Sequence, residues 1–415
     1  PLIRWSPFMA RNRNETQFDD YREWQWIKHL ILRDYAYVWA RILGSAYPHL
    51  IAVDACAGAG SYTNPDTGET MADGSAPILG RVAKAYTEER GPGKSMHLIC
   101  CERNMHNYAS LLRAVQRFQP HVTTLAGSFH RHVPAIMEEL GNSPALVLLD
   151  PIGVATIPAH KWRPLLERKG KTDLFIVLHM AGVHRVGGWL TAKGEPNPDI
   201  APARRGVAMM DRVFNGRRWR EIAVDPALAG KKYREERERR YLELFYEDVI
   251  ASRMKFKCCC EVRAVHDGRV KYWFVLASGD FKAYQLMNDE IVKVNEILLG
   301  REYGGEGTIE GFARTDLEAQ RAHVEGQMLK FVVELLRGVP GGTLPEGVIE
   351  EKLLSRFFGR AKSNVPWRVI KGLCKSDRLE REKNKAAAAD PLEMISLPTP
   401  PDTEGGAVVP IRRVA

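Results

Sequence analysis

Short apolar runs alternate with helical stretches along the first half of the chain. Apolar residues recur at helical spacing from Glu23 to Leu43, which predicts a long opening helix. Runs that are apolar on both faces predict buried strands at 49–54, 96–102, 121–126, 145–150 and 174–178, with helices at 76–86, 108–118 and 133–140. Strands of this kind, separated by helices, favour a doubly wound α/β fold whose mainly parallel sheet is covered on both faces.

The pattern changes after the fifth predicted strand. Residues 187–230 are rich in Gly, Pro and Arg and indicate an insertion, and a charged helix is expected at 233–249. Two further strands, 257–265 and 270–277, flank an Asp-Gly turn that is typical of a hairpin. This hairpin would add antiparallel strands to the sheet.

A second domain is predicted near the C-terminus. Helical patterns at 327–336, 345–357 and 365–375 precede a short charged strand, an order that suggests a winged helix-turn-helix. The predicted organisation is therefore a basic N-terminal arm at 1–20, an α/β domain at 21–315, a winged-helix domain at 316–383 and a low-complexity tail at 384–415.

Charge favours a polyanionic partner. The chain of 415 residues carries a net charge of +9, and the excess is concentrated in 201–240 and 355–383. Such stretches are often only solvated faces, but they are also the sequence pattern of nucleic-acid contacts. The candidate nucleic-acid-binding residues are Arg217, Arg218, Arg368, Lys371 and Lys375.

The cysteines indicate a reducing, cytoplasmic environment. There are seven, with no C-x-x-C pair, and no apolar run is long enough to span a membrane. Cys258, Cys259 and Cys260 are adjacent in a predicted strand, so their side chains alternate between its faces and favour structural thiols over a metal site. His130 and His132 lack a third ligand nearby, so no metal is expected.

Candidate chemistry is concentrated where the predicted strands end, because ligands of doubly wound sheets bind there. The first strand ends at Asp54 and is followed by Ala55, Cys56, Ala57, Gly58 and Gly60, a glycine-rich turn that lets a ligand approach the backbone. The turn is neither G-x-G-x-x-G nor a P-loop. Glu102 follows the second strand and could accept hydrogen bonds from a ribose. Ser128 and Phe129 follow the third strand and could frame a purine.

The fourth strand ends on Asp150-Pro151-Ile152-Gly153. Proline biases Asp150 toward an extended backbone and presents the carboxylate and nearby carbonyls to a pocket. An acceptor pair of this kind suits an exocyclic amine, which must lose a proton as it attacks an electrophilic carbon. The candidate catalytic residues are Asp150, Pro151 and Gly153.

These blocks, taken in order, resemble the three-Cys-motif partner (TcmP) proteins, which have a class I S-adenosylmethionine-dependent methyltransferase fold. The similarity rests on an opening helix with Trp26-Ile27-Lys28-His29, on the loop from Val53 to Tyr62, on Glu102 and on Asp150-Pro151-Ile152-Gly153. Cys56 and Ile152 each replace a phenylalanine of the family pattern, and Gly74-Ser75-Ala76-Pro77 departs from its G-S-P. The resemblance covers roughly residues 20–380.

The resemblance implies S-adenosylmethionine as the cofactor and a radical-SAM-like three-Cys-motif protein as a partner. The D-P-F-G pattern is also similar to that of tRNA dimethylguanosine methyltransferases, which act on exocyclic amines. We therefore expect an N-methyltransferase for a nucleobase in DNA or RNA. Two other readings remain open: a nucleic-acid-binding partner with little turnover, and a different use of the bound cofactor.

Overall fold

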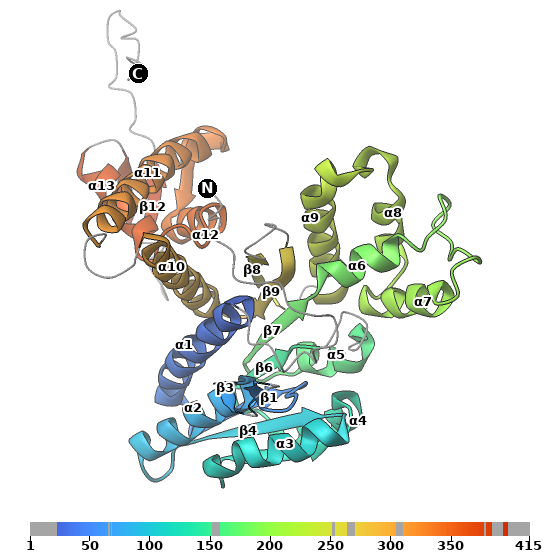
Figure 1. Cartoon of the computed structure of the whole chain (residues 1–415). Helices are drawn as coiled ribbons and strands as arrows, with labels where there is room; N and C mark the ends of the chain where they lie inside the picture. Colours follow the sequence, from blue (N-terminus) through green and yellow to red (C-terminus); the bar gives the residue numbers. More distant parts are fainter. Residues whose placement is uncertain are drawn as a thin grey trace, which may run out of the picture. The chain divides into compact units, whose positions relative to one another are not determined.

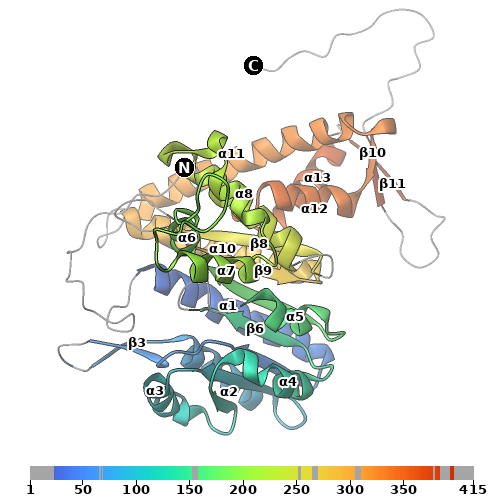
Figure 2. The same ribbon diagram turned by 90° about the vertical axis from the view of Figure 1, so that its right-hand side faces the viewer.

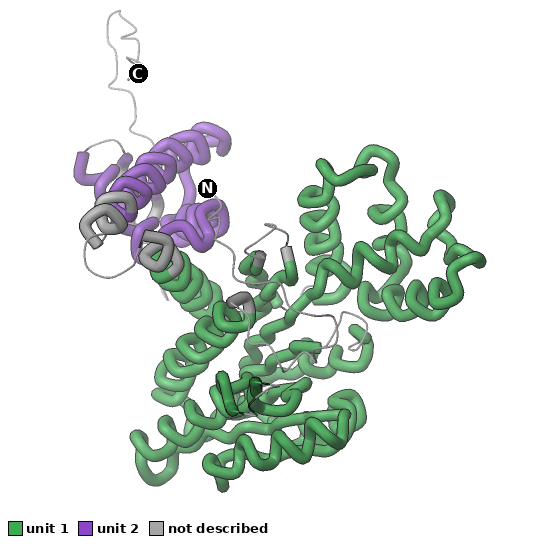
Figure 3. Tube along the Cα trace, in the orientation of Figure 1, with its two compact units in different colours: residues 1–298 green, residues 299–415 purple. Residues whose placement is uncertain are grey.

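The computed structural model describes residues 23–64, 67, 69–151, 158–250, 254–263, 270–303, 310–376, 379–383 and 393–396. The predicted arm lies outside these residues, and so does the predicted tail apart from 393–396. The chain forms two compact units, Pro1–Leu298 and Leu299–Ala415 (Figure 3). The division falls within a helix, Phe281–Tyr303, earlier in the chain than the boundary we placed at 315/316.

A seven-stranded sheet organises the first unit (Figure 1). Its strands are β1 (His49–Asp54), β4 (Ser95–Glu102), β5 (Val122–Ala126), β6 (Ala145–Leu149), β7 (Thr172–Leu178), β8 (Phe256–Arg263) and β9 (Val270–Ser278). They are arranged in the order β5-β4-β1-β6-β7-β9-β8. The first five are parallel, and β9 pairs antiparallel with both β7 and β8. The doubly wound α/β prediction is therefore confirmed, including the antiparallel hairpin.

Helices cover both faces of this sheet (Figures 1 and 2). Those before the insertion are α1 (Glu23–Ala46), α2 (Ser75–Arg90), α3 (Met105–Val115), α4 (Phe129–Leu140), α5 (Ala159–Glu167) and α6 (Met180–Gly187). The α5 helix and a small hairpin of β2 (Ser61–Thr63) and β3 (Thr70–Asp73) were not predicted.

Side-chain alternation along the strands explains why both faces are covered. On one face, Val147 and Ile176 pack in a core with residues of α4, α5 and α6. On the other face, Phe175 makes an edge contact with Tyr35 of α1, at 4.7 Å between ring centroids. Strands that are apolar on both sides need this double cover, which is what the sequence pattern indicated.

The predicted insertion is helical rather than a loop. It contains α7 (Ala203–Val213) and α8 (Arg218–Val224), and α9 (Arg234–Phe245) follows and passes into a π-helical turn, Tyr246–Ile250. These helices gather beside α6 (Figure 1). Phe214 and Trp219 are fully buried in the core they share with the sheet.

The second unit combines helices with a small antiparallel sheet. Its helices are α11 (Glu310–Arg337), α12 (Glu346–Arg356) and α13 (Val365–Lys375), preceded by α10 (Phe281–Tyr303), which crosses the division. The strands β10 (Thr343–Pro345), β11 (Glu380–Lys383) and β12 (Glu393–Ser396) pair in the order β10-β12-β11. Met328, Leu353 and Ile370 lie in a core of their own. Within the described ranges, no helix of the chain is both long and apolar enough to cross a membrane.

Candidate functional site

A pocket opens at the carboxyl ends of β1, β4, β5 and β6. Most of the residues singled out from the sequence line it: Ala55, Cys56, Ala57, Gly58, Gly60, Glu102, Ser128, Phe129 and Asp150. Asp54 lies fully buried next to them at the end of β1. The strand ends that the sequence predicted to converge therefore do meet at one pocket.

The glycine-rich turn is held by backbone hydrogen bonds to the neighbouring strands. The N–H of Ala55 donates to the Leu148 carbonyl of β6, and the N–H of Ala57 donates to the Cys101 carbonyl of β4, each at 2.9 Å. Gly58 and Gly60 adopt positive φ angles of 65° and 80°, which disfavour other residues. The turn is thereby fixed between β4 and β6 with its backbone facing the pocket.

Glu102 fastens the same turn from the end of β4. Its Oε2 accepts the N–H of Gly58 at 2.9 Å, and its Oε1 accepts the N–H of Asn104 at 2.6 Å. A carboxylate offers about four lone-pair sites, so both oxygens retain acceptor capacity. Glu102 can therefore support the turn and still bind hydroxyl groups in the pocket.

The carboxyl group of Asp54 is fully buried beside the pocket. Its Oδ1 accepts the N–H of Cys56 at 3.2 Å, whereas its buried Oδ2 has no hydrogen-bond partner among the described residues. Burial raises the pKa of this carboxyl to about 6, although the nearby Ser75 hydroxyl and Cys56 N–H favour the charged form. Asp54 is thus a buried acceptor beside the pocket with one oxygen that lacks a hydrogen bond from the described residues.

The opening helix α1 contributes a side chain that the sequence did not assign to the site. Lys28 is buried, and its ammonium group donates a hydrogen bond to Oδ2 of Asp150. Although burial opposes the charged form, the Asp150 carboxylate and other nearby acids leave the pKa of Lys28 above its usual value. Oδ1 of Asp150 accepts no hydrogen bond from the described residues, so it is available to a ligand.

Aromatic groups surround this ion pair. The ammonium of Lys28 lies 6.0 Å from the ring centroid of Tyr272, and the ring centroids of His29 and Tyr62 are 5.7 Å apart. Burial and the adjacent Lys28 hold the pKa of His29 well below its usual value. The available signal in the sequence was two polar residues, Lys28 and His29, inside the apolar stripe of a predicted helix.

The motif residues after Asp150 are less closely connected with the pocket. Pro151 is buried and lines a separate small apolar cavity, and its backbone carbonyl hydrogen-bonds His179, which partly offsets the lowering of the His179 pKa by burial. Gly153, like Ile152, lies outside the described residues. The predicted roles of Pro151 and Gly153 stay predictions.

The predicted nucleic-acid-binding residues are exposed, but their surroundings differ. Arg218 is ion-paired with Asp248 at 2.6 Å and Glu247 at 3.2 Å, whereas Arg217 forms no such pair with a described residue. In α13, Arg368 pairs with Glu325, and Lys371 lies 4.5 Å from the ring centroid of the exposed Trp367. Lys375 is exposed at the last turn of α13.

The other motifs of the sequence have local partners. His132 hydrogen-bonds the Ala126 carbonyl at 3.0 Å, and His130 lies 3.4 Å from the Ser128 hydroxyl. Burial raises the pKa of the Cys258 thiol, and all seven cysteines are free. Within the described part of the chain, no group of three or more His, Cys, Asp or Glu side chains could hold a metal ion.

The sheet defines the class of fold. Numbered along the chain, its strands follow the order 3-2-1-4-5-7-6 with only the seventh antiparallel to the rest, which is the sheet of class I methyltransferase-like folds. A ligand pocket at the carboxyl ends of its central strands agrees with this class.

Comparisons with known proteins place the chain no more narrowly. No family model and no curated protein matches it. A protein proposed to be an rRNA-methylase from Clostridium thermocellum is similar over 55% of this chain and 87% of its own, with 11% identity and a TM-score of 0.26. A proposed O-methyltransferase from Klebsiella pneumoniae is similar over 59% of this chain and 78% of its own, with 15% identity and a TM-score of 0.29.

Proposed function

We propose that the chain is an S-adenosylmethionine-dependent methyltransferase that modifies an exocyclic amine of a nucleobase in DNA or RNA. The observation that carries the proposal is that Glu102 and Asp150, from the ends of β4 and β6, line one pocket beside a glycine-rich turn, with Asp54 buried next to them at the end of the strand between. The three acids would have different roles, because each lies in a different environment.

The residues of the β1 and β4 ends fit the cofactor. The unpartnered Oδ2 of Asp54 suits the ammonium group of the methionine part, and the remaining lone pairs of Glu102 suit the ribose hydroxyls. Phe129 and Ser128 line the pocket where a purine would lie. When bound there, S-adenosylmethionine supplies a methyl group that is already activated for transfer.

Asp150 would orient and deprotonate the target amine. Its Oδ2 is held by Lys28, and Oδ1 would accept an N–H of the amine. As the nitrogen gains the methyl group, it loses one proton to Asp150 or, through it, to water. Since Lys28 stabilises the carboxylate, Asp150 acts mainly by fixing the direction of the nitrogen lone pair, and positioning would contribute most of the rate.

The second unit supports a nucleic-acid substrate. Its order of elements, α11-β10-α12-α13-β11-β12, agrees with the winged-helix proposal, and its third helix exposes Trp367, Arg368 and Lys371. Membership of the TcmP family and partnership with a radical-SAM-like three-Cys-motif protein are part of the same proposal and rest on the motif resemblance.

Two measurements test the proposal. Calorimetry should detect S-adenosylmethionine binding to the full chain, and mass spectrometry of nucleic acid incubated with protein and cofactor should detect a methylated base. Absence of cofactor binding would rule out the enzyme. Cofactor binding with no methyl transfer to any nucleic acid would instead favour the binding-partner function, and a product of another mass would indicate different chemistry at the same pocket.

A further inference from the structure

A group of basic side chains lies at the mouth of the pocket and on the elements next to it, and only Arg212 among them falls in a stretch, 201–240, that the sequence singled out for nucleic-acid contact. We call it the basic rim. It consists of Arg103, His130, Arg131, His160, Lys161, Arg163 and Arg212, all of which are exposed. Arg103, His130 and Lys161 line the pocket itself.

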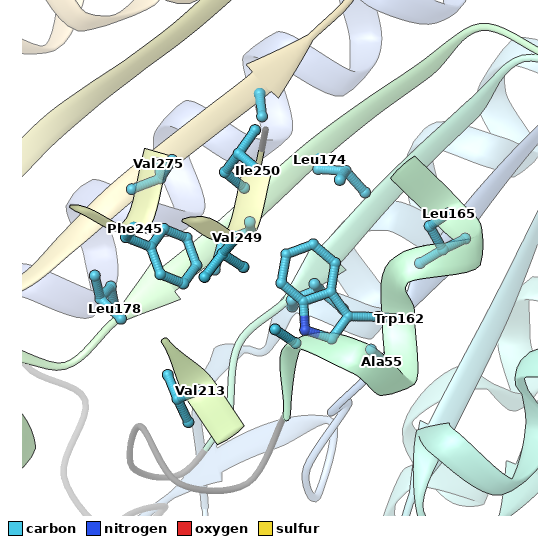
Figure 4. Close-up of a cluster of buried hydrophobic side chains, with 14 of the residues drawn as sticks. Ala55, Trp162, Leu165, Leu174, Leu178, Val213, Phe245, Val249, Ile250 and Val275 are labelled. Carbon is cyan, nitrogen blue, oxygen red and sulfur yellow. The ribbon is translucent and has the colours of Figure 1, made fainter. Parts of the chain in front are cut away.

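The rim comes from elements packed side by side. Arg103 follows β4, the next residues belong to α4 and α5, and Arg212 belongs to α7; α5 packs against both α4 and α7. Figure 4 shows Trp162 of α5 inserted into the hydrophobic core between the sheet and the helices around Val249. Because Trp162 is buried, its neighbours Lys161 and Arg163 are fixed on the solvent side of α5.

The charges of the rim are not balanced by acids. Neither its arginines nor Lys161 form an ion pair with a described residue, and Arg163 donates a hydrogen bond to the neutral side chain of Asn215. Burial and the surrounding cations lower the pKa values of His130 and His160. Within the described residues, no ion pair offsets the charge of these arginines and Lys161.

The placement of these cations also opposes helix stability. Arg131 lies in the first turn of α4 and Lys161 in the first turn of α5, and neither turn contains an acidic residue. The positive end of a helix dipole favours acids and disfavours cations in this turn. Basic residues here therefore weaken the helices, which points to a role other than folding.

The arginines of α9 and α1 differ from the rim in having acidic partners. In α9, Arg239 pairs with Glu236 and Glu243, and Arg240 pairs with Glu236 and Asp225. In α1, Arg41 pairs with Glu89. These arginines have acidic partners in the chain, whereas the rim does not.

We propose that the basic rim binds the phosphate backbone of the nucleic-acid strand whose base enters the pocket. Cations spread over these elements from Arg103 to Arg212 could contact successive phosphates, and Arg103 and Lys161 line the same pocket as Asp150. A nucleic acid is the polyanion that combines regularly spaced phosphates with a group that fills such a pocket. The inference rests on the proposed function for the identity of the base-binding pocket, but phosphate binding can be measured without it.

The test compares two triple variants of the full chain that lose the same charge. In the rim variant, Arg131→Gln, Lys161→Gln and Arg163→Gln remove unpaired cations; in the control, Arg41→Gln, Arg239→Gln and Arg240→Gln remove paired ones. Fluorescence anisotropy with a labelled single-stranded RNA and the same DNA sequence gives affinity as a function of salt. Calorimetry with S-adenosylmethionine and thermal unfolding are measured on both variants.

We expect the rim variant to bind the labelled strand about tenfold or more weakly at low salt, and its salt slope to fall by about 2, since each phosphate contact on a single strand contributes about 0.7. The control should bind like the unmodified chain, and the melting temperature of the rim variant should not fall. Equal affinity of the two variants for both strands would overturn the rim proposal while leaving the methyltransferase proposal intact. If the unmodified chain does not bind S-adenosylmethionine, the methyltransferase proposal is overturned and the proposal that the rim binds phosphates is unaffected.

Discussion

The two sides of the pocket are built by different means. On the side of β1 and β4, the N–H groups of the glycine-rich turn donate to the backbone carbonyls of Leu148 and Cys101 and to the carboxylate of Glu102. On the side of β6, the pocket depends on buried charge, with Lys28 of α1 paired to Asp150. One side is fixed by conformation and the other by electrostatics.

This difference indicates what each side can recognise. A backbone cradle is complementary to one ligand shape, which suits an invariant cofactor. A buried ion pair with one free carboxylate oxygen selects a hydrogen-bond donor of the right direction, which suits the group that receives the methyl. The predictions below separate the two sides, because changes on one should leave the function of the other intact.

The largest effect is expected from Asp150→Asn. The amide keeps the shape but cannot take a proton, and its NH₂ group can displace the target amine, so methyl transfer should fall by about 10²- to 10⁴-fold. Radiometric transfer assays check the rate, and calorimetry should show nearly unchanged cofactor affinity. A large loss of cofactor affinity would mean that the two sides are not separable.

The second effect concerns stability. Lys28→Met leaves the Asp150 carboxylate without its partner in a largely buried position and should lower the free energy of unfolding by about 3 kcal/mol. The double variant Lys28→Met, Asp150→Leu removes both charges and should regain most of that loss. Urea unfolding of the single and double variants measures the coupling, and additive losses would contradict the buried pair as the organising contact of this side.

The same contrast explains how much the sequence could predict. The apolar runs predicted β1, β4, β5, β6 and β7 within two residues. Because parallel strands end at one edge of a sheet, they also placed Glu102 and Asp150 at one pocket, with Asp54 buried beside them. Local patterns suffice for the backbone side of the pocket, since the glycines and the acids adjoin their own strands.

The charged side of the pocket and the basic rim could not be predicted in this way. Lys28 and Asp150 are 122 residues apart, and only the packing of α1 over the sheet brings them together. The rim is gathered from β4, α4, α5 and α7, and α5 itself was not predicted. The local excess of positive charge in the sequence instead pointed to Arg218 as a nucleic-acid-binding residue, and its charge is balanced by Asp248 and Glu247.

A third prediction concerns the pH dependence of stability that is caused by Asp54, on the β1 side of the pocket. The pKa of Asp54 is about 6 in the folded chain, against 3.8 for an ordinary aspartate side chain. Between these two pH values the folded state therefore keeps a proton that the unfolded state releases. The contribution of Asp54 to stability therefore falls as pH rises from about 4 to about 6, by on the order of 3 kcal/mol. The Asp54→Asn variant lacks this pH-dependent contribution, so its stability relative to the unmodified chain should rise between about pH 4 and about pH 6. Urea unfolding at several pH values measures the difference.

Asp173 provides the matched control for Asp54. It is buried on the α1 face of the sheet, bonded to Tyr35 and Ser278, and its pKa is also about 6. Asp173→Asn should show a similar trend of stability with pH but bind S-adenosylmethionine like the unmodified chain. Asp54→Asn should weaken that binding, because an acceptor for the ammonium group loses its charge. If both variants bind cofactor equally well, Asp54 is a structural acid and not part of the cofactor site.

The smallest effect is expected from the turn itself. Gly60 has a φ of 80°, and a Cβ placed on it would lie 2.8 Å from Cβ of Ala114 in α3, whereas Gly93 has a φ of 84° and nothing within 4 Å. Both Gly60→Ala and Gly93→Ala should lose about 1 kcal/mol from the positive φ. Gly60→Ala should lose about 1 kcal/mol more and should also weaken cofactor binding, because α3 and the turn must move apart. Thermal unfolding and calorimetry measure the stability and the cofactor affinity of the two variants. If Gly60→Ala and Gly93→Ala lose the same stability and bind the cofactor equally well, the turn accommodates the added methyl group, and its conformation is less fixed than the hydrogen bonds to β4 and β6 imply.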